Sequence, residues 1–257
     1  MRRTMVRMTS YLIMLVALLA GGPSGTTQDF SVPVLMYHRV DTLDAKERGN
    51  RLLADLTVSP GEFGQQVDWL SSHGYTILPL RQIEDAVRLG KRLPLHAVAL
   101  TFDDGYEDNY TQAFPILRRR HVPATIFIVA NTVGTPKHLT WRQTAEMEKA
   151  GIAFGSHGMD HVDLTHLSMA MLDKELRGSR QVLGKRLLNP VTDIAYPAGR
   201  VNAEVMVRGK ADGYLAGWGK SGGPVHKNSP MLDLPRIRVS GGMSLRGFAS
   251  MIERASR

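Results

Sequence analysis

The chain has 257 residues, of which 43% are hydrophobic and 22% charged, an ordinary globular composition at a length that can bury a full core as one domain. Its formal net charge of +8 comes from scattered basic residues, which indicates a solvated basic surface and no nucleic-acid partner. It contains no cysteine, which excludes disulfides, a lipidated cysteine and thiolate metal ligands, so any metal site must use His, Asp or Glu.

Residues 1–24 have the layout of a secretory signal, with arginines first, then an apolar stretch from Tyr11 to Ala20 and then small residues. This apolar stretch is too short for a comfortable membrane span. No clean A-x-A cleavage site follows it, so a cleaved signal peptide and an uncleaved N-terminal anchor are both open. We expect an exported monomer, periplasmic, cell-surface or secreted, that contacts the membrane only through an uncleaved anchor.

After this segment, short apolar runs alternate with amphipathic stretches, which predicts repeated β-α units rather than a β-sandwich. Ser59-Pro60-Gly61-Glu62 combines an N-cap, a proline at the first helical position and a glutamate that completes a capping box. We expect one catalytic domain over residues 32–257. The expected strands are Val32–His38, Tyr75–Pro79, Ala97–Phe102, Ala124–Val129, Ile152–Gly155, Asp193–Tyr196 and Tyr214–Trp218, and further helices are expected at Thr140–Lys149, Ser168–Leu187 and Met243–Arg254.

The stretch Asp41–Asp55 is charged and lacks periodicity, so we expect a surface loop that interrupts the first β-α unit. It is either a solvated connection or a rim over the site, because long loops in compact domains are often functional.

Four of the expected strands end in polar residues, and in a parallel β/α barrel the carboxyl ends of the strands all face one way. We therefore expect these residues to converge on one site. They are Tyr37-His38, Asp103-Asp104-Gly105, Ser156-His157 with His161, and Tyr196-Pro197-Ala198-Gly199.

Two neighbouring aspartates at a strand end, Asp103 and Asp104, can be no more than a turn signal and a helix cap. Beside a cation, one carboxylate can ligate the ion while the other takes a proton from the attacking water. His157 and His161 are spaced i and i+4, so they can face the same way on a helical turn and present two imidazoles to one ion. Two histidines and one carboxylate suit zinc, and also cobalt, nickel or iron.

His38 ends the first expected strand. It is either a half-buried, hydrogen-bonded histidine or a general acid that protonates the leaving group. The residues alone favour the first interpretation. The remaining histidines lie in turn-like or polar surroundings and receive no role.

Thr101-Phe102-Asp103-Asp104-Gly105 and Ser156-His157-x-x-x-His161 resemble the first two motifs of the polysaccharide deacetylases, which are carbohydrate esterase family 4 and carry the NodB-homology domain. The motif order, which begins at Met36-Tyr37-His38, is similar to the single-domain branch that deacetylates the poly-β-1,6-N-acetylglucosamine of biofilms. Val162 follows the second histidine, where peptidoglycan and chitin deacetylases usually have proline.

This resemblance implies a deformed (β/α)7 barrel that removes N-acetyl groups from an extracellular N-acetylglucosamine polysaccharide and releases acetate. It implies one divalent metal ion, zinc first, with cobalt, nickel or iron as alternatives. The implied ligands are Asp104, His157 and His161.

The same resemblance assigns the remaining roles. Asp103 is implied as the base, His38 as the acid and Arg236 as the residue that holds the base in place. A backbone N–H of the loop Pro197-Ala198-Gly199 is implied as a donor to the oxyanion.

Three other functions stay open at this point. A peptidoglycan or chitin N-deacetylase, or an O-acetyl xylan esterase, would have the same site. A non-catalytic glycan-binding surface domain is a different class, but it would need neither a base at Asp103 nor an acid at His38. A magnesium-dependent phosphoryl-transfer enzyme ranks last, because imidazoles are poor ligands for a hard ion.

Overall fold

The computed structural model describes residues 29–257, so the expected signal or anchor at 1–24 lies outside the described residues. Its centre is a sheet in which every neighbouring pair is parallel, in the order β10-β9-β8-β7-β6-β2-β12, with β5 beside the start of β6. The strands are β2 (Val34–Tyr37), β5 (Thr76–Ile77), β6 (Ala97–Phe102), β7 (Thr125–Ile128), β8 (Ala153–Ser156), β9 (Asp193–Ala195), β10 (Ala216–Trp218) and β12 (Ile237–Arg238).

The two edges of this sheet approach each other, so the sheet curls into a barrel. Between β10 and β12, Leu234 forms a parallel bridge with Trp218. The Leu234 N–H donates to Gly217 O, and the Gly219 N–H donates to Leu234 O, both at 2.8 Å. The expected deformed (β/α)7 barrel is therefore confirmed, with the segment before β12 closing the gap.

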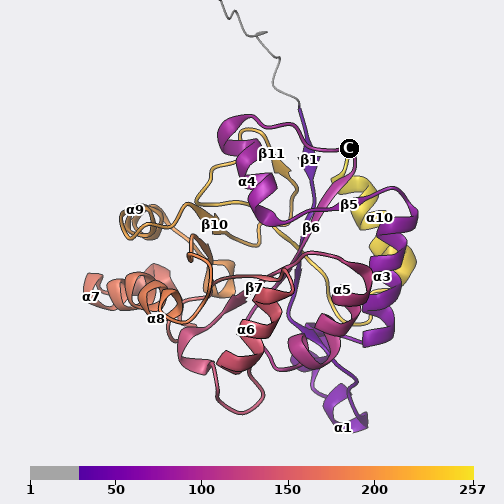
Figure 1. The fold of residues 1–257 in the computed structure, drawn as a ribbon, viewed down its shortest axis with the longest axis horizontal. Coiled ribbons are helices and arrows are strands. Elements are labelled where there is room, and N and C mark those ends of the chain that lie inside the picture. The colour runs from indigo at the N-terminus through magenta and orange to yellow at the C-terminus, as the bar shows by residue number, and fades with distance from the viewer. Residues whose placement is uncertain (1–28) are drawn as a thin grey trace, which may run out of the picture.

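Helices surround the barrel, with α3, α5 and α10 along one side and α7, α8 and α9 along the other (Figure 1). The α-helices are α1 (Ala45–Arg48), α2 (Arg51–Leu56), α3 (Pro60–Ser72), α4 (Leu80–Leu89), α5 (Phe114–Arg120), α6 (Trp141–Lys149), α7 (Met169–Asp173), α8 (Ser179–Gly184), α9 (Ala203–Ala211) and α10 (Leu245–Ala255). Short 3-10 turns are η2 (Ala130–Thr132), η3 (Leu164–His166) and η5 (Pro197–Gly199), and π-helical turns are η1 (Asn109–Ala113) and η4 (Lys174–Gly178). Two small strand pairs lie outside the barrel, β1 (Ser31–Val32) with β11 (Val225–His226) and β3 (Arg39–Val40) with β4 (Thr57–Val58).

Hydrophobic side chains fill both faces of the sheet, which is why β6 is buried at every position. One cluster lies between the sheet and the outer helices. The other cluster brings Ile83 of α4 together with Phe127 and Trp218 of the barrel strands. Glu84 of α4 also contacts Asp193 at the start of β9, so α4 covers the amino-terminal end of the barrel and leaves the carboxyl ends of the strands open for a site.

The structure confirms the expected strands, the capping box at Ser59 and the helix that begins after Thr140 and ends at Lys149. The expected helix over Ser168–Leu187 is divided by the π-helical turn η4. The prediction of an irregular loop over Asp41–Asp55 is wrong, because α1 and α2 form there behind N-caps at Asp44 and Asn50. Helices of four and six residues are too short to produce a visible periodicity. Within residues 29–257, no helix has the length and apolar character to cross a bilayer.

Candidate active site and metal centre

Asp103 and Asp104 directly follow β6 at the carboxyl end of the barrel. Asp104 and Gly105 both have a φ of 71°, in the left-handed region, which turns the chain sharply after the strand. A Cβ at Gly105 would lie 2.6 Å from Ile128 Cγ2 of the neighbouring strand. Glycine is therefore required there for both backbone angle and space, and the turn points the two carboxylates in different directions.

Asp104, His157 and His161 form a group that could hold a metal ion, with ligand atoms within 4.8 Å of one another. Asp104 Oδ1 lies 3.4 Å from His157 Nε2 and 3.3 Å from His161 Nε2. This oxygen is buried and has no hydrogen-bond partner among residues 29–257.

The tautomer of His157 supports the same interpretation. His157 Nδ1 lies 2.7 Å from Ala195 O, and a carbonyl oxygen can only accept, so Nδ1 carries the hydrogen. In the neutral ring the lone pair of Nε2 faces the carboxylate of Asp104, and a metal cation between these two electron-pair donors would offset their repulsion. An imidazole whose other nitrogen is held by a backbone carbonyl is the usual arrangement of a metal ligand. The residues fit a divalent cation.

The ionisation of these groups follows from burial and neighbouring charge. Burial raises the pKa of Asp104, but His157, His38 and His161 outweigh it and hold the pKa of this carboxyl well below its usual range. Burial lowers the pKa of His157, while Asp103 and Asp104 raise it to a value above that of free histidine. Burial, and then the charge of His157, lower the pKa of His161.

The expected helical turn for the two histidines is wrong. Residues 157–163 form a loop in which Gly158 has a φ of 83° and His161 a φ of 57°. The i, i+4 spacing is compatible with a helix, but a left-handed residue after the first histidine ends any helix there. The left-handed backbone at Gly158 and His161 turns the loop so that both imidazoles lie beside Asp104.

Asp103 makes a buried ion pair with Arg236. The guanidinium donates from Nη1 to Oδ1 at 2.6 Å and from Nη2 to Oδ2 at 2.8 Å. Arg236 is itself fixed by Gly219 O at 3.0 Å and by the hydroxyl of Thr101 at 3.2 Å. Burial raises the pKa of Asp103, but the charges of Arg236 and His157 bring it below its usual value. Asp103 is therefore an ionised carboxylate in a fixed orientation.

His38 follows β2 and is half-buried. Burial lowers the pKa of His38, and the carboxylates of Asp103 and Asp104 partly offset this effect, which places the ring among the same charges. Its backbone oxygen accepts a hydrogen bond of 2.9 Å from Asn109 Nδ2. Asp108 accepts from Val40 N at 3.0 Å and from Arg39 Nε at 2.8 Å.

Asp108 and Asn109 were not predicted as site residues, although they follow the Asp-Asp-Gly motif after only two residues. Both are buried polar residues, at 5% and 0% exposure. The sequence signal that could have identified them is the run of polar residues that begins directly after the buried strand β6.

The loop Pro197-Ala198-Gly199 lies at the carboxyl end of β9. Ala198 has a φ of 53°. Proline has no N–H, and the Gly199 N–H donates to Tyr196 O at 2.7 Å, so Ala198 is the amide that this loop can offer to a substrate. Its role, like the roles of Asp103, His38 and Arg236, stays a prediction.

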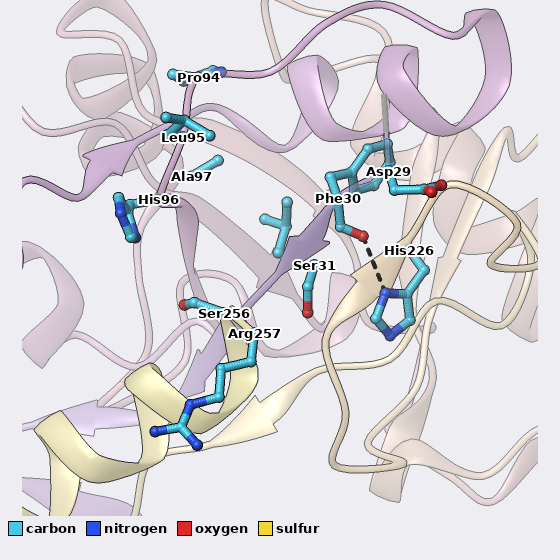
Figure 2. Close-up of a pocket in the computed structure, with 11 residues that line it drawn as sticks. Asp29, Phe30, Ser31, Pro94, Leu95, His96, Ala97, His226, Ser256 and Arg257 are labelled. Carbon is cyan, nitrogen blue, oxygen red and sulfur yellow. Dashed lines mark hydrogen bonds between the residues drawn. The ribbon is translucent and has the colours of Figure 1, made fainter. Parts of the chain in front are cut away.

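Two cavities have no candidate site residue in their lining. One of about 360 Å³ is lined by the first residues of β1 and β6 and by His226, at the amino-terminal end of the barrel, and no candidate site residue lines it (Figure 2). The other, of about 560 Å³, lies between α1, α2 and Gly241-Gly242. Its lining residue Asp55 pairs with Arg238, two residues after Arg236 on β12. The segment Asp41–Asp55 therefore forms one wall of a cleft near the candidate site.

Several known proteins are similar to this chain in sequence and in fold. The polysaccharide deacetylase family model matches residues 90–217. The chain is 33% identical over 228 residues to YxkH of Bacillus subtilis, whose name places it among the polysaccharide deacetylases, with 89% of this chain and 78% of YxkH covered. It is 28% identical over 230 residues to the poly-β-1,6-N-acetyl-D-glucosamine N-deacetylase of Staphylococcus epidermidis, with 82% of this chain and 79% of the relative covered. The deacetylase PplD of Streptococcus pyogenes, solved in complex with acetate, has a TM-score of 0.82 at 30% identity, with 88% of this chain and 99% of that chain covered.

A curled β/α barrel with these relatives defines a carbohydrate-modifying hydrolase. The chain belongs to the polysaccharide deacetylase family, carbohydrate esterase family 4. It is an enzyme, as its sequence motifs predicted.

Proposed function

We propose that this polysaccharide deacetylase is exported and removes N-acetyl groups from an N-acetylglucosamine polymer by metal-dependent hydrolysis. The first candidate polymer is the poly-β-1,6-N-acetylglucosamine of a biofilm matrix. Residues 32–257 would form the catalytic domain, and residues 1–24 would serve as a signal peptide or an N-terminal anchor. The name of the Staphylococcus epidermidis relative and the early position of His38 in the motif order support this substrate.

The observation that carries the proposal is the different surroundings of two adjacent aspartates. Asp103 is paired with Arg236, whereas Asp104 faces two imidazoles. Asp103 would thus serve as the catalytic base, and Asp104 would serve as a metal ligand. A protein that only bound glycans would not need this division.

Asp104, His157 and His161 would hold the divalent cation, with zinc as our first choice and cobalt, nickel or iron as alternatives for the same ligands. When bound, the cation would polarise the acetyl carbonyl and lower the pKa of the attacking water from about 16 towards 7.

The residues of the chain then divide the proton transfers between them. Asp103 accepts a proton from the attacking water on a carboxylate oxygen, since Arg236 occupies only one lone pair of each oxygen. The water oxygen bonds to the acetyl carbon, and the Ala198 N–H donates to the carbonyl oxygen as negative charge develops. The C–N bond breaks as His38 protonates the departing sugar nitrogen. The products are acetate and a free amine on the polymer.

Acetate release from four purified glycans tests this function. Poly-β-1,6-N-acetylglucosamine, chitin oligomers, peptidoglycan and O-acetyl xylan would be incubated with metal-loaded protein, and we expect the first to be the best substrate. Asp103→Asn keeps the shape of the side chain but removes the base, so turnover should fall at least about a hundredfold. Activity restricted to O-acetyl xylan would contradict the substrate, and full activity of Asp103→Asn would contradict the mechanism.

A further inference from the structure

The loop that carries His157 and His161 has its backbone hydrogen-bonded at successive residues. The His157 N–H donates to Ile128 O at 2.9 Å, and the Gly158 N–H donates to the hydroxyl of Ser156 at 3.1 Å. The carbonyl oxygens of Gly158 and Met159 accept from the N–H groups of η2 at 3.0 and 3.1 Å. A loop held in this way presents its side chains in one arrangement.

The next two amides of this loop, those of Met159 and Asp160, share one acceptor, Glu175. Its Oε2 accepts from Met159 N at 2.8 Å and from Asp160 N at 3.1 Å. Successive N–H groups that converge on one carboxylate oxygen form an anion-binding nest. The nest depends on Gly158, whose φ is 83°, because a Cβ there would lie 3.0 Å from Glu175 Oε2.

Glu175 lies in the π-helical turn η4. Wide π-helical turns inside α-helices occur frequently at functional sites. Glu175 is fully buried, and its other oxygen, Oε1, has no hydrogen-bond partner in the part of the chain that the structure describes. A buried carboxylate with one unsatisfied oxygen costs folding free energy, so stability alone is a poor reason for a glutamate at this position.

We infer that Glu175 is a positioning residue of the metal centre, which sets the distance and direction of the two imidazoles by clamping the backbone between them. The inference rests on the proposed metal site. Removal of hydrogen-bonded groups behind metal ligands typically costs about 10- to 100-fold in metal affinity. Glu175 should therefore control zinc affinity although it touches no reacting atom.

Glu148 provides a matched control on the opposite end of the barrel. It is also a buried glutamate, at 8% exposure, and it also accepts from two successive amides, Leu188 N at 2.9 Å and Asn189 N at 3.2 Å. This pair of amides lies in the loop before β9, whereas the metal group lies after β6 and β8. Glu148→Gln should change stability in the same way as Glu175→Gln but should not change zinc affinity.

The experiment measures the Kd for zinc of the metal-free wild type, Glu175→Gln, Glu175→Asp and Glu148→Gln by competition with a chromogenic chelator, together with the Tm of each. We expect Glu175→Gln to weaken zinc binding about 10- to 100-fold, with activity largely restored at saturating zinc. Glu175→Asp keeps the charge, but its side chain is one carbon shorter and no longer reaches the two amides, so it should also weaken zinc binding. It replaces Glu175→Gln in the comparison if that variant does not fold.

Zinc affinities of the Glu175 variants equal to that of the wild type would overturn the inference. Equal losses of affinity in Glu175→Gln and Glu148→Gln would also overturn it, because the effect would then be general destabilisation. Failure of the wild type to bind zinc would instead overturn the proposed metal site and this inference with it.

Discussion

Arg236 holds both carboxylate oxygens of Asp103, at 2.6 and 2.8 Å, although 133 positions separate the two residues in sequence. Arg236 and Asp103 are only 1% and 3% exposed. Two parallel charge-assisted hydrogen bonds fix the plane of the carboxylate as well as its charge. The pair therefore determines where the remaining lone pairs of Asp103 can receive a proton.

Replacement of Arg236 by methionine should destabilise the fold and abolish turnover. The change leaves the carboxylate of Asp103 buried without its counter-charge, which typically costs about 3–5 kcal/mol. Urea denaturation measures this loss. Arg238→Met is the matched control, because Arg238 lies two residues away and forms a half-exposed pair with Asp55 of α2. This variant should lose less than about 1 kcal/mol of stability. Similar losses in the two variants would show that the buried pair has no special structural importance.

His38→Ala and His157→Ala should separate acid catalysis from metal binding. His157→Ala removes a proposed ligand, so purified protein should lose both metal and activity. His38→Ala should keep its metal and turn over roughly a hundredfold more slowly, because only the general acid is removed. Metal analysis and acetate release on the same preparations make the comparison. Loss of metal from His38→Ala would contradict its assignment as the acid.

Glu84 should make the fold less stable as the pH rises. Burial, and then the hydrogen bond to Asp193 and the charge of that residue, raise the pKa of this carboxyl in α4 to about 10. A folded-state pKa above the unfolded value favours the protonated form, so its stabilising effect is complete below about pH 4.5 and is lost progressively up to about pH 10. Wild-type Tm should fall between pH 5 and about pH 9.

Glu84→Gln removes this titration but still offers a hydrogen-bond donor to Asp193. Its Tm should therefore depend less on pH over the same range, and it should exceed that of the wild type at alkaline pH. Scanning calorimetry at several pH values gives both curves. Parallel curves for the two proteins would show that Glu84 is not the group responsible.

Gly105→Ala should destabilise the protein by at least about 2 kcal/mol, since it combines a left-handed backbone with overpacking against Ile128. Gly61→Ala is the control, because Gly61 lies in the first turn of α3 with nothing within 4 Å of the added Cβ. That change should be neutral or stabilise by up to about 1 kcal/mol. Equal Tm values for Gly105→Ala and the wild type would contradict the requirement for glycine.

The sequence predicts the parts of this fold that depend on neighbouring residues. The apolar run Ala97–Phe102 matches β6 at both ends, and the capping box at Ser59 begins α3 as expected. These signals are local, because strand burial and helix capping each involve a few consecutive residues. The convergence of strand ends then follows from the parallel topology.

The remaining features depend on contacts between distant segments. No local pattern distinguishes a loop from a helical turn at His157 and His161, and the loop is fixed by Glu175 and by backbone contacts with η2. The wide turn η4 also has no sequence signature. The bond between Asn109 and the backbone of His38 joins residues 71 positions apart, so it becomes visible only in the folded chain.

The position of Arg236 directly before β12 has a consequence for biosynthesis. The ribosome releases Asp103 long before residues 231–238, which close the barrel and supply its counter-charge. Until this segment docks, the carboxylate must stay in water or take up a proton, so the base that we propose would not yet be competent. Hydrolysis by the base that we propose would therefore wait until residues 231–238 have been made and have docked.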